Sequence, residues 1–306
     1  MPVSSQLRTA HVRSIALCTA LIILCMPLLL SRATAQESSP DLPPGQNPHG
    51  MHVYIWGGLK THPPGRHDYP QFLADWSKLL TDHGAIVDGS LHPPTAADLE
   101  HTDVVLLYKG DAGYLTDEQK AALTAFIKRG GGIVSLHDSL CGPDPEQFAT
   151  FVGAGKKHGE VNYTNPAPVT YNIVDKADPI MADMSDFTLF DEAFFKMTFA
   201  QNPGIHVLAT AVMAKTPSSG AHAGEVVPQI WTYEHTQSGG QPARAFVWMQ
   251  GDRYENFQNY QVERMLLRGI AWAGKQPVDS LINYVAPPRP ARPGQPATGQ
   301  PPAPGQ

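Results

Sequence analysis

Two residues at the end of a short apolar run, His137 and Asp138, could perform acid–base chemistry. Residues 133–136 contain one polar side chain, Ser135, and are typical of a strand buried inside a sheet. A histidine directly after such a strand can exchange a proton near neutral pH, and an adjacent aspartate can orient its ring. The same pair could supply metal ligands, or the histidine could cap the sheet edge through hydrogen bonds. We predict His137 as a catalytic base and Asp138 as the residue that orients it.

Carboxylates elsewhere in the chain are the candidate proton donors. Asp191 and Glu192 stand between Phe190 and the apolar residues 193–195, where a buried acid is costly unless it is paired or functional. A salt bridge or an exposed edge would explain the pair equally well. Asp252 follows another apolar run. The prediction is that Glu192 or Asp252 acts as the acid.

Several histidines could bind a divalent metal. The chain has 13 histidines. Four of them could combine with Asp252 into a set of N and O ligands, namely His62, His67, His137 and His158. None of them stands in an HxH or HExxH spacing. The sequence therefore predicts no cofactor, leaves a divalent metal open and assigns no metal ligand.

The polar loops also suggest residues that bind a substrate. We predict substrate-binding roles for His62, His67, His158, Arg253 and Tyr254. Tyr254, Trp231 and Trp248 could form a face on which a sugar stacks, although such aromatic residues more often belong to the core.

These candidates need a scaffold in which strands and helices alternate. Short apolar runs predict strands at 52–56, 85–87, 104–108 and 133–136. Helical periodicity predicts a helix at 70–81, and a capping box at 116–119 predicts the start of a second helix that ends at residue 129. Further strands are predicted at 169–174, 207–213, 229–233 and 245–249, followed by a helix at 258–273. Such alternation indicates a mostly parallel sheet covered on both faces. Because ligands bind beyond the carboxyl ends of parallel strands, the loops after these strands should converge.

The two ends of the chain differ in composition from this middle part. Residues 1–35 combine Arg8 and Arg13, a 16-residue apolar run and an Ala33-Thr34-Ala35 site, which predicts a secretory signal peptide. An uncleaved anchor is the alternative. Residues 36–50 form a Pro-rich linker, 51–285 one α/β domain, and 286–306 a disordered Pro-rich tail. We expect a periplasmic or secreted protein with no membrane span after cleavage.

Charge and cysteine content limit the partners and the chemistry. The formal charge is −6, and removal of the signal would make it about −9. An acidic chain without a basic stripe argues against nucleic-acid binding. The mature chain would keep one cysteine, Cys141, and so could form no internal disulfide.

Six segments in this order resemble the ThuA-like (trehalose-utilisation) family over about residues 51–275. They read VLLYKGDAGYLTDEQKAALTAFIKRGGG at 105–132, GGGIVSLHDS at 130–139, DPIMADMSDFTLFDEAFF at 178–195, PQIWTYEH at 228–235, ARAFVWMQGD at 243–252 and LLRGIAWAGK at 266–275. The sequence departs from the family where a final Gly-His is Gly251-Asp252, and around His158, where the pattern is only loosely kept.

The resemblance implies a fold and a substrate class. The fold would be a three-layer, flavodoxin-like α/β sandwich with a mostly parallel sheet, similar to that of class I glutamine amidotransferases. Those enzymes place a nucleophilic cysteine directly after the strand that here precedes His137. Cys141 lies four residues further on, so the resemblance implies the scaffold without glutaminase activity.

The resemblance also implies work on carbohydrates, with a small-molecule sugar as the partner. We expect acid–base chemistry on trehalose or a keto-sugar by a hydrolase, lyase or isomerase. A non-catalytic sugar-binding or scaffold protein and a metal-dependent hydrolase are the alternatives. An NAD-dependent oxidoreductase is not expected, because the Gly57-Gly58 turn lacks GxGxxG. The sequence gives no basis for an oligomeric state.

Overall fold

The computed structural model describes residues 50–202 and 204–287. The predicted signal peptide, almost all of the linker and almost all of the tail lie outside these residues and stay predictions. Within the described part of the chain, no helix combines the length and the apolar composition that a bilayer span requires.

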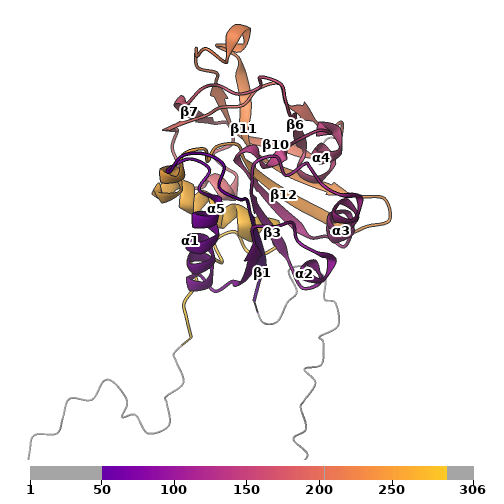
Figure 1. The fold of residues 1–306 in the computed structure, drawn as a ribbon. Coiled ribbons are helices and arrows are strands. Elements are labelled where there is room, and N and C mark those ends of the chain that lie inside the picture. Colours follow the sequence, from indigo (N-terminus) through magenta and orange to yellow (C-terminus); the bar gives the residue numbers. More distant parts are fainter. Residues whose placement is uncertain (1–49, 203, 288–306) are drawn as a thin grey trace, which may run out of the picture. The chain divides into compact units, whose positions relative to one another are not determined.

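A nine-stranded sheet forms the centre of the domain (Figure 1), with strand order β2-β1-β3-β4-β12-β11-β10-β7-β8. The strands are β1 His52–Gly57, β2 Ile86–Ser90, β3 Val104–Tyr108, β4 Gly132–Leu136, β7 Ala167–Ile173, β8 Phe187–Asp191, β10 Ile205–Val212, β11 Val226–Thr236 and β12 Pro242–Trp248. A small second sheet contains β5 Cys141–Gly142, β6 Ala154–Lys157 and β9 Thr198–Phe199.

The large sheet is mixed. The pairs β1–β2, β1–β3, β3–β4 and β4–β12 are parallel. The pairs from β12 through β11, β10 and β7 to β8 are antiparallel. No helix stands between β11 and β12, and antiparallel neighbours can be joined by such short loops. The parallel half therefore matches the prediction, whereas the other half of the sheet is antiparallel.

Helices cover both faces of the sheet (Figure 1). On one face lie α1 Tyr69–Asp82 and α5 Tyr260–Ala273, and on the other lie α2 Ala96–Glu100, α3 Asp117–Lys128 and α4 Pro145–Val152. Short 3-10 helices are η1 His137–Leu140, η2 Pro179–Met181, η3 Gly220–His222 and η4 Tyr254–Gln258. Side chains alternate between the two faces, so that Ile55 packs in one core cluster and Trp56 in the other. The predicted three-layer α/β fold is confirmed.

Strand β8 has no counterpart among the predicted elements. Phe190 faces outward on this edge strand and is 46% exposed, whereas Leu189 and Asp191 are buried. An aromatic residue on the solvent side and an acid on the inner side reverse the usual alternation of a half-buried strand. The hydrophobic alternation therefore did not indicate a strand in this segment, although β8 positions Asp191.

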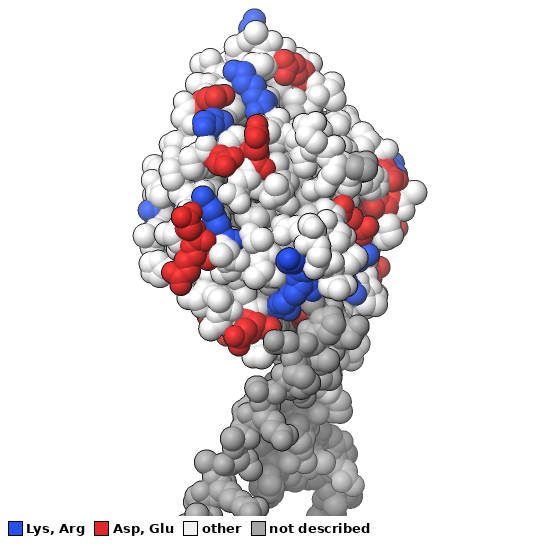
Figure 2. Space-filling model, turned by 90° about the vertical axis from the view of Figure 1, so that its right-hand side faces the viewer, with Lys and Arg blue, Asp and Glu red and all other residues white. Residues whose placement is uncertain are grey.

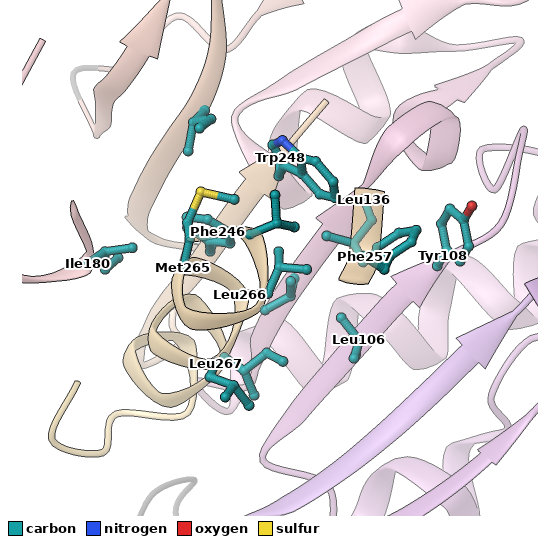
Figure 3. Packing of buried hydrophobic residues seen from close by; sticks show 14 of the residues in the cluster. Leu106, Tyr108, Leu136, Ile180, Phe246, Trp248, Phe257, Met265, Leu266 and Leu267 are labelled. Carbon is teal, nitrogen blue, oxygen red and sulfur yellow. The ribbon is translucent and has the colours of Figure 1, made fainter. Parts of the chain in front are cut away.

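Helix α5 packs against the core cluster that contains Ile55. Its buried stripe recurs at the helical spacing of the sequence and consists of Val262, Met265, Leu266 and Ile270, all of which are 0% exposed. Figure 3 shows Met265 and Leu266 on α5 beside Phe246 of β12, at the centre of the packed cluster. This packing fixes the position of β12 and of the loop that follows it.

Substitution of Leu266 by alanine should lower the free energy of unfolding by about 2–5 kcal/mol, because it removes a fully buried side chain and leaves a cavity. Urea unfolding of the described domain measures this loss. Replacement of the exposed Leu59 by alanine is the matched control and should change stability by less than about 0.5 kcal/mol. Equal losses in the two variants would contradict the packing described here.

Charged side chains of both signs are interspersed on the face of the molecule shown in Figure 2, and that face carries no continuous basic stripe.

Candidate functional site

His137 lies where β4 ends and η1 begins. Its backbone has φ 55°, a left-handed conformation that is costly for a residue with a side chain. The ring is 1% exposed, and its Nε2 lies 2.8 Å from Nε2 of His67. The predicted orienting partner, Asp138, instead forms an ion pair with Lys156. The side chain within hydrogen-bonding distance of the His137 ring is therefore His67, and not Asp138.

His67 comes from the loop before α1 and is itself buried, with φ 47°. Its Nε2 lies 3.3 Å from Oδ1 of Asp252, and its backbone N–H donates to the Asp252 carbonyl oxygen at 3.0 Å. Its Nδ1 lies 3.2 Å from the Thr61 hydroxyl, and the ring centroid of His62 is 3.9 Å from its own. Three loops that are far apart in sequence thus meet at one point.

Arg66 joins the two predicted acids. Its Nε donates to both carboxylate oxygens of Asp252, at 2.9 and 2.7 Å, and a terminal nitrogen donates to Oε1 of Glu192 at 2.9 Å. Arg66 is not among the site residues predicted from the sequence. Two buried acids at one sheet edge require a nearby positive charge. A basic residue in the loop after the first strand could therefore have been expected to pair with them.

The resulting centre is a connected network. It runs from Glu192 through Arg66 and Asp252 to His67 and His137. Asp252 and His137 form its buried floor, whereas the Arg66 and Glu192 side chains are 29% and 13% exposed. Arg66 and Glu192 are therefore the members of the network that lie nearest to solvent.

Asp191 supports the network from beneath. The side chain is 0% exposed and accepts hydrogen bonds from the backbone N–H groups of Glu192, Gly251, Asp252 and Arg253 and from the Asn256 amide. Burial and the charge of Asp252 raise the pKa of Asp191 to about 7, although the Asn256 amide and the backbone N–H groups of Glu192 and Gly251 lower it. Of the two adjacent acids, Asp191 therefore holds the loop after β12 and Glu192 faces the site.

Replacement of Asp191 by asparagine should cost about 1–3 kcal/mol of unfolding free energy at about pH 6, below the raised pKa of Asp191, where both side chains are uncharged in the folded protein. All five partners are donors, so the new NH2 group leaves some of them unpaired. Urea unfolding measures the loss, with the exposed Asp88→Asn as the control. An Asp191→Asn protein as stable as Asp88→Asn would show that these hydrogen bonds do not hold the loop.

The surroundings raise the pKa of Glu192 and lower the pKa values of His67 and His137. Burial, with the Asp252 charge, raises the pKa of Glu192 to about 8, although the Arg66 guanidinium lowers it. Burial lowers the pKa of His67 to about 3, and burial together with the His67 ring lowers the pKa of His137 well below its usual range. Near neutral pH the site therefore holds a protonated carboxyl and two neutral imidazoles. Glu192 is thus placed as a proton donor, and the imidazoles are unprotonated, although the burial that keeps them neutral also makes them weak bases.

Other predicted site residues have different partners. His158 is exposed, and its Nδ1 lies 2.8 Å from Oδ1 of Asp111. The Tyr254 hydroxyl donates to Asp75 at 2.5 Å, and the Arg253 guanidinium lies 5.3 Å from the Phe190 ring centroid. The structure therefore gives these three residues contacts outside the His67–His137 pair.

The two candidate stacking tryptophans belong to the core. Trp231 and Trp248 are 0% exposed, and their indole N–H groups donate to the Val152 carbonyl at 2.9 Å and to the Tyr171 hydroxyl at 3.0 Å. They present no face to a sugar, so that option is excluded.

Cys141 is buried within β5. Burial, with the Asp138 charge, raises the pKa of its thiol, which keeps the sulfur protonated and poorly nucleophilic.

Comparison with known proteins identifies the family. A family model described as trehalose utilisation matches residues 53–273. A ThuA-like protein from Parabacteroides merdae has a similar structure, with a TM-score of 0.55 and 19% identity over 74% of this chain and 90% of that one. A ThuA-like protein from Bacteroides uniformis gives a TM-score of 0.53 and 16% identity over 76% of this chain and 95% of that one. No curated protein sequence matches the chain. With more than two thirds of its length matched by the family model, the chain belongs to the ThuA family, which is described by its role in trehalose utilisation.

Proposed function

We propose that the protein acts on trehalose or a keto-sugar derived from it, and that it does so by acid–base chemistry at the network around His137. The observation that carries the proposal is the connection of Glu192 to the His67–His137 pair through Arg66 and Asp252. Family membership supports the substrate class.

The chemistry follows from the protonation states. Hydrolysis, elimination and isomerisation of a keto-sugar each require one group that takes a proton and another that gives one. Glu192 carries a proton near neutral pH and can deliver it to a departing glycosidic oxygen or to a carbonyl oxygen. The neutral imidazoles can accept the proton that the sugar or a water molecule releases. The partly exposed Arg66 guanidinium offers N–H donors for sugar hydroxyl groups.

Two assays test the proposal. The purified protein is incubated with trehalose and with mono-keto disaccharides, and products are followed by NMR. A deletion strain is grown on disaccharides while its metabolites are profiled. We expect loss of one disaccharide in the first assay and its accumulation in the second. Binding of a sugar without turnover would overturn the catalytic proposal in favour of a sugar-binding protein, and no sugar effect in either assay would overturn both.

We also propose that the protein is exported to the periplasm or beyond. The Ala33-Thr34-Ala35 site at the end of an apolar run supports this. N-terminal sequencing of protein from the cell envelope should return a start near Gln36. A mature protein that retains Met1 would contradict the export proposal.

A further inference from the structure

We propose that His67, His137 and Asp252 form a binding site for one divalent transition-metal ion. A ring nitrogen of His67, a ring nitrogen of His137 and a carboxylate oxygen of Asp252 all lie within 4.8 Å of one another, and all three residues are buried. The two Nε2 atoms lie 2.8 Å apart, and Nε2 of His67 lies 3.3 Å from Oδ1 of Asp252. Ligand atoms of a tetrahedral zinc ion, each about 2.0–2.1 Å from the metal, lie about 3.3 Å apart. Opening the imidazole pair by about half an ångström would therefore admit an ion.

The surrounding contacts orient these three ligand atoms. The Thr61 hydroxyl lies at Nδ1 of His67, on the side of the ring opposite the meeting point, which leaves Nε2 for the ion. Arg66 uses one lone pair of each Asp252 oxygen, and a carboxylate oxygen has a second one to offer. His67 and His137 both have left-handed backbones, and such strain is concentrated at functional sites. A simple contact between two rings would require neither the orienting hydrogen bonds nor the left-handed backbones.

Charge also favours a cation at this point. Asp191 and Asp252 are both 0% exposed, and Glu192 lies next to them. Among the contacts described above, Arg66 is the cation that touches this acidic group, through Asp252 and Glu192. Buried carboxylates are stable when they are paired or coordinate a metal. A divalent ion beside Asp252 would be stabilised by these carboxyl groups, and its charge would favour their ionised forms.

The ligand types select the kind of metal. Imidazole nitrogens suit zinc, iron, copper and nickel, whereas magnesium and calcium prefer oxygen ligands. A site with three protein ligands leaves a position for water or a substrate oxygen, as in catalytic zinc sites. The role of the ion in catalysis rests on the proposed function, whereas the binding of the ion does not. In a loaded protein the imidazoles would be ligands, and the proton acceptor in the sugar reaction would be a hydroxide on the metal, formed when a bound water molecule releases a proton to solvent.

Metal binding can be measured without any sugar. Protein freed of metal by chelation is titrated with Zn²⁺ by calorimetry, in the presence of excess Mg²⁺. The expected result is one Zn²⁺ per chain, with affinity weakened by at least about 100-fold in His137→Asn and in Asp252→Asn. Asparagine at position 137 tolerates the left-handed backbone, and circular dichroism confirms that each variant is folded. The exposed His92→Ala is the matched control and should bind like the original protein.

A second cluster provides the competing explanation. Asp111, Cys141 and His158 also bring three potential ligand atoms within 4.8 Å of one another. The variant His158→Ala and the visible spectrum of a Co²⁺ complex separate the two sites, because a thiolate ligand adds an intense sulfur-to-cobalt band. Loss of binding in His158→Ala but not in His137→Asn, a sulfur band, or no Zn²⁺ binding at all would overturn the inference. None of these results would alter the outcome of the sugar assays, and His137 would then remain the proposed base. Conversely, a failed sugar assay would leave the measured metal binding intact.

Discussion

Replacement of His137 by asparagine is expected to slow turnover of the sugar by about 10²- to 10⁴-fold. The substitution removes the imidazole that meets His67 in the buried centre, whether it serves as a base or as a metal ligand. Asparagine is preferred to alanine here, because it adopts a left-handed backbone such as the φ of 55° at position 137 with less strain. The rate of product formation by the purified variant measures the loss, and complementation of the deletion strain tests it in cells.

The control for this prediction separates chemistry from folding. Thermal unfolding of His137→Asn is compared with that of His92→Asn, which changes an exposed histidine outside the network. His92→Asn should keep full activity. A His137→Asn protein that unfolds early but retains its activity per folded molecule would make His137 a structural residue.

Glu192→Gln should reduce turnover by a similar factor of about 10² to 10⁴, because the amide keeps the size of the side chain but cannot transfer a proton. In the original protein, the pKa of Glu192 is raised to about 8, and its protonated form is the donor. Activity of the original protein should therefore decline as the pH rises through about 8, and the residual activity of the variant should lack that decline. A pH–rate profile of both proteins, with the exposed Glu255→Gln as the control, checks the result.

The same carboxyl links stability to pH. The ordinary pKa of Glu192 is 4.5, so the unfolded chain releases the proton there, whereas the folded protein retains it until about 8. The contribution of this proton to stability is fully present below pH 4.5 and is lost as the pH rises through about 8. Glutamine does not ionise, so the unfolding free energy of Glu192→Gln should fall less than that of the original protein between about pH 5 and about pH 9. Parallel pH dependences would show that Glu192 is ionised throughout, and would remove it as the proton donor.

The sequence determined the parallel half of the sheet and the position of His137. Runs such as residues 104–108 and 133–136 are apolar on both faces, which is a property of buried parallel strands and needs no partner to be recognised. The spacing of Val262, Met265, Leu266 and Ile270 likewise fixes the buried side of α5. Because the end of a parallel strand faces the ligand side of the sheet, the residue after β4 could be selected from its place in the chain.

The partners of His137 and Glu192 were decided by tertiary structure. His67 and Arg66 stand on a loop without regular periodicity, so no local pattern indicates which way their side chains turn or which acids they meet. Asp138 is adjacent to His137 in sequence, yet Lys156 from β6 takes its carboxylate, because a position beside a residue does not determine where its side chain points. Asp191 and Glu192 are also neighbours, and the edge strand β8 turns Asp191 beneath the loop after β12 while Glu192 reaches Arg66. Contacts between loops that are 60 or more residues apart depend on the register of the whole sheet, which no short segment of the sequence encodes.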